Sequence, residues 1–136
     1  GQHSDVFAGV TEGLERLAQA QCRLACLTNK PVDFARDLLR LKGLDRYFQV
    51  VFGGDSFERK KPDPLPVRAT CQALGSLPER TLMVGDSRND ALAAHGAGCD
   101  VVLMRYGYNH GEPVETVPAL AYLDRLDHLP SEWLAI

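Results

Sequence analysis

The segment Gly85-Asp86-Ser87-Arg88-Asn89-Asp90 carries two carboxylates four residues apart. A glycine lets the backbone turn sharply off the apolar run before it, and Asp90 then lies within one helical turn of Asp86. Two carboxylates held this close repel each other unless a proton or a cation lies between them. Oxygen ligands of this kind suit Mg²⁺, so both side chains are candidate metal ligands. A helix cap with an acidic first turn is the alternative interpretation.

A second polar segment, Thr28-Asn29-Lys30-Pro31, lies between an apolar run and a predicted helix. It offers a hydroxyl, an amide and free backbone N–H groups at a strand-to-helix junction. Such junctions suit anions because helix N-termini attract phosphate. Thr28 and Asn29 are therefore candidate phosphate-binding residues, and capping of the helix by the same side chains is the alternative.

A third segment, Lys61-Pro62-Asp63-Pro64, holds a lysine directly before a proline. Proline restricts the backbone of the residue before it, which can fix the direction of the Lys61 side chain in an otherwise mobile loop. An ammonium group held near a carboxylate and a phosphoryl group would offset their negative charge. The alternative is an ordinary solvated basic turn.

The elements that must hold these segments alternate between strand and helix. Apolar spacing and turn residues predict helices near 9–20, 31–43, 65–74 and 88–96, and strands at 23–27, 48–52, 81–84, 100–104 and 121–123. Strands separated by helices of this length form right-handed crossovers in a parallel sheet. Ligands bind at the carboxyl ends of such strands, where all three polar segments lie.

The length and composition are typical of a single folded domain, which is expected to cover residues 1–136. Apolar residues make up 45% and charged residues 24%, and 15 basic against 18 acidic residues give a net charge of −3, which argues against a nucleic-acid partner. No apolar stretch is long enough for a membrane span, and the first residues do not resemble a secretory signal. The four cysteines form no Cys-x-x-Cys pair and fit a reducing compartment, so a cytoplasmic location is expected.

The three segments in this order resemble motifs of the haloacid dehalogenase superfamily, specifically its phosphoglycolate phosphatase branch. Residues 28–31 match its second motif, residues 61–64 its third and residues 85–90 its fourth. Tyr106–Gly111 resembles the segment that follows the last core strand in phosphoglycolate phosphatases. The resemblance implies an α/β fold: a Rossmann-like parallel sheet in three α/β/α layers.

The resemblance also implies a role for each candidate residue. Thr28 would hydrogen-bond the transferring phosphoryl oxygens, with Asn29 assisting through its backbone. Lys61 would neutralise charge on the nucleophile and the phosphoryl group. Asp86 would bind Mg²⁺ directly, and Asp90 would be a ligand or act through a water molecule. The implied activity is Mg²⁺-dependent hydrolysis of a small phosphate monoester through an aspartyl-phosphate, with 2-phosphoglycolate as the favoured substrate.

The family's first motif, Asp-x-Asp-Gly-x-Thr, has no counterpart, because no Asp-x-Asp occurs in the 136 residues. The helical cap domain has none either. We expect the first strand, which carries the nucleophile, and the cap to be lost from this chain, and the chain alone to be inactive. In the family's strand order, 5-4-1-2-3, the strands that end at Thr28 and Asp86 flank the missing strand. Those strands could pair with each other, accept a strand from another chain as in a dimer, or leave the fold marginal.

Two other functions stay open. One is a different small-phosphoester phosphatase of the same superfamily, or a sugar-phosphate mutase. The other is a degenerate, non-catalytic domain of this superfamily that acts as a binding module. A dinucleotide-binding domain is disfavoured, because no Gly-x-Gly-x-x-Gly follows a predicted strand.

Overall fold

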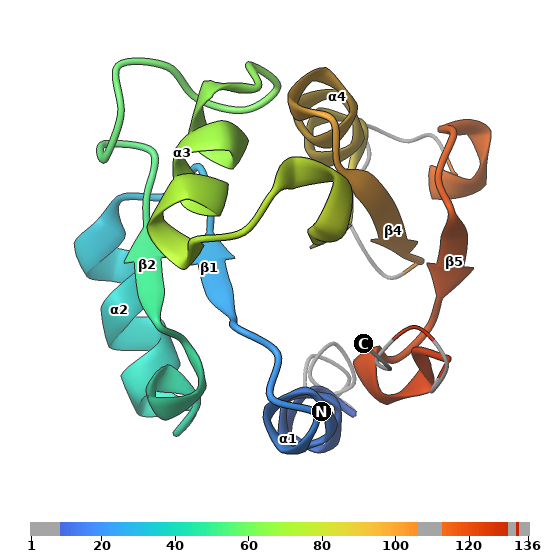
Figure 1. Cartoon of the computed structure of the whole chain (residues 1–136). Coiled ribbons are helices and arrows are strands. Elements are labelled where there is room, and N and C mark those ends of the chain that lie inside the picture. Colours follow the sequence, from blue (N-terminus) through green and yellow to red (C-terminus); the bar gives the residue numbers. More distant parts are fainter. Residues whose placement is uncertain (1–8, 106–112, 131–132, 134–136) are drawn as a thin grey trace.

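The computed structural model describes residues 9–105, 113–130 and 133, and it places four α-helices and five strands among them (Figure 1). The helices are α1 (Val10–Gln19), α2 (Val32–Leu41), α3 (Leu65–Leu74) and α4 (Arg88–Ala97). The strands are β1 (Ala25–Leu27), β2 (Val50–Phe52), β3 (Leu82–Gly85), β4 (Asp100–Met104) and β5 (Ala121–Leu123). The bounds differ from the predicted ones by at most two residues at either end.

Proline and glycine set several helix ends. Helix α2 begins directly after Pro31, which lacks an N–H that a helix start does not need. Helices α3 and α4 end at Gly75 and Gly98, with φ of 70° and 90°. This left-handed conformation is easily adopted by glycine and closes the last helical turn.

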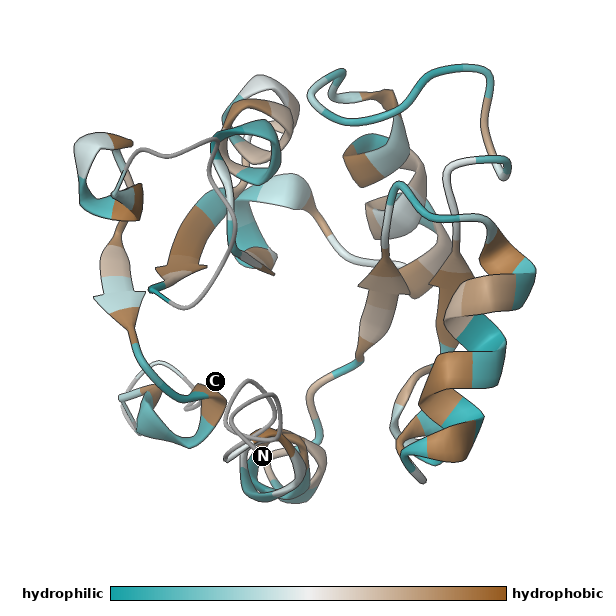
Figure 2. Ribbon diagram, turned by 180° about the vertical axis from the view of Figure 1, so that it is seen from behind, coloured by the Kyte–Doolittle hydropathy of each residue, from teal (hydrophilic) through white to brown (hydrophobic). Residues whose placement is uncertain are grey.

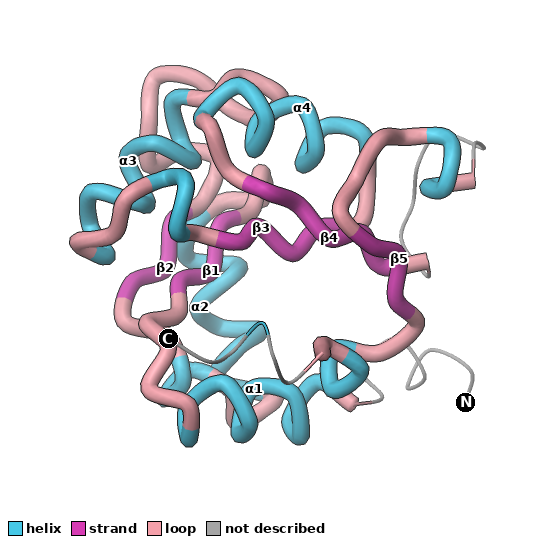
Figure 3. Tube along the Cα trace, turned by 45° about the vertical axis from the view of Figure 1, so that its right-hand side comes forward, coloured by secondary structure: helices cyan, strands magenta, loops and turns pink. Residues whose placement is uncertain are grey.

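The five strands form two separate parallel sheets. β1 pairs with β2, and in the other sheet β3, β4 and β5 lie in that order. Figure 3 shows β1 and β3 on the inner sides of the two groups, so the spatial order is β2-β1-β3-β4-β5 with an interruption in the middle. The two strands flanking the expected gap are those predicted. β1 and β3 do not pair with each other. Direct pairing of the two flanking strands, the first of the three outcomes expected for the missing strand, is therefore excluded for this structure.

Helices cover both faces and join the two sheets. Figure 3 shows α3 and α4 on one side of the strands and α1 and α2 on the other, which confirms the three-layer α/β/α arrangement. Helix α3 packs on β1 and β2, α4 packs on β3 and β4, and the two helices contact each other. Arg68 Nη2 of α3 also donates to the carbonyl oxygen of Gly96 in α4, at 2.8 Å. The layer of α3 and α4 therefore spans the interruption.

The hydrophobic core is concentrated on the side of β4. Val101, Val102 and Leu103 are fully buried there, and Val101 and Leu103 share a core cluster with the alanine-rich face of α4. By contrast, α2 exposes Phe34 at 55% and Leu41 at 81% of their surface, and Figure 2 shows hydrophobic residues both in the strands and along this helix. Within the described residues, none of the helices has the length and hydrophobicity needed to cross a bilayer.

Candidate active site

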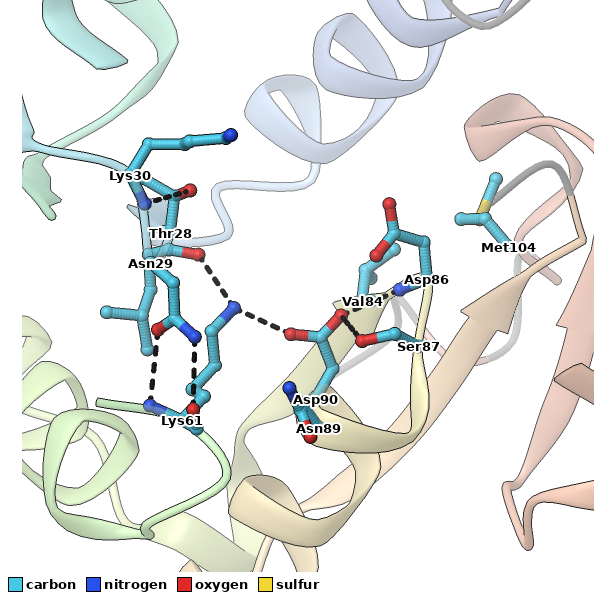
Figure 4. Close-up of a pocket in the computed structure, with 12 residues that line it drawn as sticks. Thr28, Asn29, Lys30, Lys61, Val84, Asp86, Ser87, Asn89, Asp90 and Met104 are labelled. Atoms are coloured by element: carbon cyan, nitrogen blue, oxygen red, sulfur yellow. Dashed lines mark hydrogen bonds and ion pairs between the residues drawn. The ribbon is translucent and has the colours of Figure 1, made fainter. Parts of the chain in front are cut away.

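The polar strand ends meet at one cavity of about 490 Å³. The carboxyl ends of β1, β3 and β4 open into it, together with the loop before α3 and the start of α4 (Figure 4). Its polar and charged lining residues are Thr28, Asn29, Lys30, Lys61, Asp86, Ser87, Asn89 and Asp90. All five residues predicted from the sequence, Thr28, Asn29, Lys61, Asp86 and Asp90, therefore share one site.

Lys61 makes the shortest charged contact in this cavity. Its Nζ lies 2.6 Å from Asp90 Oδ1, and both side chains are less than a tenth exposed. The same ammonium donates to the carbonyl oxygen of Leu27, the last residue of β1, at 3.2 Å. Because a buried charge needs both a counter-charge and hydrogen bonds, these two contacts fix where the ammonium lies.

The second oxygen of Asp90 is also engaged. Oδ2 accepts the backbone N–H of Asp86 at 2.8 Å and the hydroxyl of Ser87 at 3.5 Å. Asp90 therefore performs part of the capping role that was the alternative for this segment, while it also pairs with Lys61. Both of its oxygens face protein donors.

Asp86 differs from Asp90 because its side chain is exposed at the cavity surface. Partial desolvation, followed by the negative charge of Asp90, raises the pKa of Asp86 to about 6, against an opposing effect of Lys61. A carboxylate whose charged form is disfavoured in this way gains most from a bound cation. Of the two cavity carboxylates, Asp86 is thus the one whose side chain is open to solvent.

The side chain of Asn29 holds the backbone of Lys61. Asn29 Nδ2 donates to the Lys61 carbonyl oxygen at 3.0 Å, and the Lys61 N–H donates to Asn29 Oδ1 at 3.2 Å. The peptide bond from Lys61 to Pro62 is cis. This side-chain contact was not predictable from the sequence, because the two residues lie 32 positions apart.

The Thr28 hydroxyl does not cap α2. Its Oγ1 accepts the backbone N–H of Lys30 at 3.2 Å, whereas the first N–H of the helix, that of Val32, donates to Asp55 Oδ1 at 2.8 Å. Asp55 follows β2 and reaches the helix from the neighbouring loop. The capping alternative for Thr28 and Asn29 is therefore not what the structure shows, and the Thr28 hydroxyl lines the cavity.

The donor set fits a hard divalent cation. The cavity holds two carboxylates, and within the described part of the chain Asp90 is paired with a cation whereas Asp86 is not. Mg²⁺ typically takes one or two protein carboxylates and completes its shell with water and phosphate oxygens. The described residues include no cluster of three or more His, Cys, Asp or Glu side chains that could hold a metal by themselves. Asp86 with solvent and a phosphate ligand matches the magnesium pattern.

Sequence reasoning assigned no role to three cavity residues, Lys30, Ser87 and Asn89. All three lie inside the polar segments 28–31 and 85–90, so their position in the sequence could have indicated a place in the site. The chemical roles were assigned to the neighbouring residues instead. The predicted Tyr106–Gly111 segment lies outside the described residues.

Comparisons with known proteins agree with this site. Residues 2–104 match the haloacid dehalogenase-like hydrolase family. A phosphoglycolate phosphatase from Thiobacillus denitrificans is 43% identical over 125 residues, which cover 88% of this chain and 55% of that protein. One from Pseudomonas aeruginosa is 41% identical over 128 residues, covering 93% of this chain and 47% of the relative. The chain therefore spans about half the length of these curated relatives.

Solved structures are also similar to this chain over most of its length. The crystal structure of a "predicted phosphoglycolate phosphatase" from Haemophilus somnus has a TM-score of 0.86 and 38% identity, and covers 89% of this chain and 54% of that one. CbbY from Rhodobacter sphaeroides in complex with phosphate has a TM-score of 0.79 and 30% identity, and covers 89% of this chain and 54% of that one.

Proposed function

Because this chain belongs to the haloacid dehalogenase-like hydrolase family, we propose that it forms the phosphate-binding half of a phosphatase active site for small phosphate monoesters. The observation that carries the proposal is that Thr28, Lys61, Asp86 and Asp90, from three separate segments, line one cavity. The relatives named phosphoglycolate phosphatase make 2-phosphoglycolate the favoured substrate of the whole protein.

Each residue has a defined task in this proposal. The Thr28 hydroxyl donates to a phosphoryl oxygen at the end of β1. Lys61 places a positive charge beside the phosphoryl group, since its ammonium is held between Leu27 and Asp90. Positive charge and hydrogen-bond donors fixed in advance stabilise the charge that develops during phosphoryl transfer.

Asp86 would hold Mg²⁺, with Asp90 acting through its contacts to Lys61 and to the Asp86 backbone. When bound, the cation would polarise the phosphoryl oxygens and offset their charge. Asn29 contributes by fixing the Lys61 backbone.

The attacking group is the part that this chain does not supply. Its 136 residues contain no Asp-x-Asp, and the gap between β1 and β3 lies beside the cavity. We propose that in the whole protein a strand with the nucleophilic aspartate fills this gap. Its aspartate would form the aspartyl-phosphate that water then hydrolyses. The coding sequence upstream of residue 1 tests this directly, since the proposal requires an Asp-x-Asp-Gly-x-Thr there.

Equilibrium binding and turnover test the function of the chain itself. We expect inorganic phosphate to bind in the presence of Mg²⁺, with binding lost in Asp86→Asn and Thr28→Val. We expect no hydrolysis of 2-phosphoglycolate above the blank. Turnover that survives repurification and disappears in Asp86→Asn would contradict the proposed lack of a nucleophile.

Two alternatives give different results in the same experiments. A sugar-phosphate mutase or another small-phosphoester phosphatase would share the phosphate site, but the whole protein would prefer a different ester. A non-catalytic binding module would have no upstream nucleophile motif.

A dimer that pairs the β1 and β3 edges facing the gap would give twice the monomer mass in light scattering.

A further inference from the structure

Lys30 is the one charged cavity residue that neither the motif roles nor the observed contacts explain. Its side chain lines the cavity, and in Figure 4 it extends across the opening from the side of Thr28 towards the side that carries Asp86. Among the described residues, none forms a side-chain hydrogen bond or ion pair with its ammonium. Lys61, by contrast, is committed to Asp90.

The backbone of Lys30 is anchored on both sides. Its N–H donates to the Thr28 hydroxyl at 3.2 Å, and its carbonyl oxygen accepts the Gly54 N–H at 2.7 Å. The preceding glycine permits this close approach, because a Cβ at Gly53 would lie 2.6 Å from the same carbonyl oxygen. A free ammonium therefore starts from a fixed point, two residues from the proposed phosphate-binding hydroxyl.

The surroundings of the side chain suit a lysine that reaches into the cavity. Lys30 also lines a neighbouring apolar cavity of about 190 Å³, together with Phe34 and Leu38 of α2. Lysine commonly lays its methylene groups along apolar surface while its ammonium stays in water. The stem thus has an apolar wall to follow, and the charge remains available to a ligand.

We propose that Lys30 is a specificity-determining residue that binds a carboxylate carried by the phosphate ester, one or two carbons from the ester oxygen. The inference rests on the proposed function, because it places the phosphoryl group at Thr28 and Lys61. With two carboxylates and two ammonium groups, the cavity has no excess of positive charge until a cation binds. A substrate with a phosphate and a carboxylate then gains from an ammonium that pairs with no side chain of the described residues.

Equilibrium binding to the 136-residue chain with Mg²⁺ tests the inference, because a chain without turnover leaves the ligand intact. Three ligands are compared: 2-phosphoglycolate, 2-hydroxyethyl phosphate, in which a hydroxymethyl group replaces the carboxylate, and inorganic phosphate. We expect the wild-type chain to prefer 2-phosphoglycolate over 2-hydroxyethyl phosphate, which lacks the carboxylate, by about tenfold, a typical effect of one charge-assisted contact. In Lys30→Met the preference should fall to within about twofold, with inorganic phosphate bound as before.

Lys60→Met is the matched control. It removes the same charge from the neighbouring loop, and Lys60 does not line the cavity. The preference should survive in this variant and largely return in Lys30→Arg. A preference that persists in Lys30→Met, or falls equally in Lys60→Met, would overturn the inference while leaving the proposed function intact. Failure of the wild-type chain to bind inorganic phosphate would overturn the proposed function, and the inference with it.

Discussion

Lys61 and Asp90 form a buried ion pair, with 2.6 Å between Nζ and Oδ1. The pair lies where the two sheets face each other, since Lys61 also donates to Leu27 of β1 and Asp90 belongs to α4, which packs on β3. It therefore links the two halves of the fold in addition to lining the cavity.

The first prediction concerns this ion pair. Removal of one partner leaves a buried charge without its counter-charge, so Asp90→Leu and Lys61→Met should each lower the free energy of unfolding by about 3 kcal/mol. The double variant should lose clearly less than the sum of the two. Urea denaturation followed by circular dichroism measures all three values. Strictly additive losses would show that the two side chains do not stabilise each other.

The second prediction concerns Asp86 and pH. Its pKa is about 6 in the folded chain, against an ordinary value of 3.8. Between these pH values the folded chain binds more protons than the unfolded chain, so stability falls as pH rises from about 4 to about 6. The shift corresponds to at most about 3 kcal/mol, and solvent screening at this exposed side chain reduces the expected contribution to about 1 kcal/mol. Asp86→Asn should remove this contribution and be more stable than wild type at neutral pH.

Mg²⁺ should offset the loss of stability that the charge on Asp86 causes at neutral pH, since a cation at Asp86 counteracts the repulsion from Asp90. We expect Mg²⁺ to raise the melting temperature of the wild-type chain and not that of Asp86→Asn. Asp37→Asn is the control, because Asp37 lies on α2 with a side chain that is 75% exposed and pairs only with the exposed Arg40. An equal effect of Mg²⁺ on all three proteins would indicate nonspecific stabilisation by salt.

The third prediction concerns Gly85, where the backbone passes close to Asp90. A Cβ at this position would overlap Asp90 Cβ and lie 2.6 Å from Asp90 Cγ, so Gly85→Ala must displace the Asp90 side chain. We expect a loss of about 1–3 kcal/mol in the free energy of unfolding, typical of overpacking, and weaker phosphate binding. In an Asp90→Gly background, which removes the Cβ of residue 90 as well as the carboxylate, the same substitution should cost much less. An unchanged cost there would place the strain elsewhere.

The fourth prediction concerns the cysteines. Cys71 and Cys99 are buried with 3.8 Å between their sulfur atoms, and burial together with Cys71 raises the pKa of Cys99 to about 12. Burial also raises the pKa of Cys26. Because the thiolate is the reactive form, iodoacetamide at mildly alkaline pH should modify Cys22 first and leave Cys71 and Cys99 intact. Mass spectrometry of tryptic peptides gives the order, and denatured chain should react at all four positions.

Most of the fold was predictable because helix and strand periods are local. The apolar spacing in residues 65–74 and 100–104 predicted α3 and β4 with their observed bounds. The grouping of Thr28, Lys61 and Asp86 at one cavity followed from the rule that ligands bind at the carboxyl ends of parallel strands.

What could not be predicted depends on contacts between distant segments. Asn29 holds Lys61 through two hydrogen bonds, and Asp55 caps the start of α2, although neither pairing leaves a periodic signal in the sequence. The same holds for the protein contacts of Asp90, whose two oxygens accept from Lys61, Ser87 and the Asp86 backbone.

The interruption between β1 and β3 also affects how this chain behaves at high concentration. Among the described strands, each of these two has a neighbour on one side only, so no described strand pairs with the N–H and C=O groups of its other edge. Such edges promote aggregation, and the exposed Phe34 and Leu41 of α2 add apolar surface in the same half of the molecule. Expressed alone, the chain should therefore precipitate or form oligomers more readily as its concentration rises, and a short peptide able to occupy the interruption should keep it in solution.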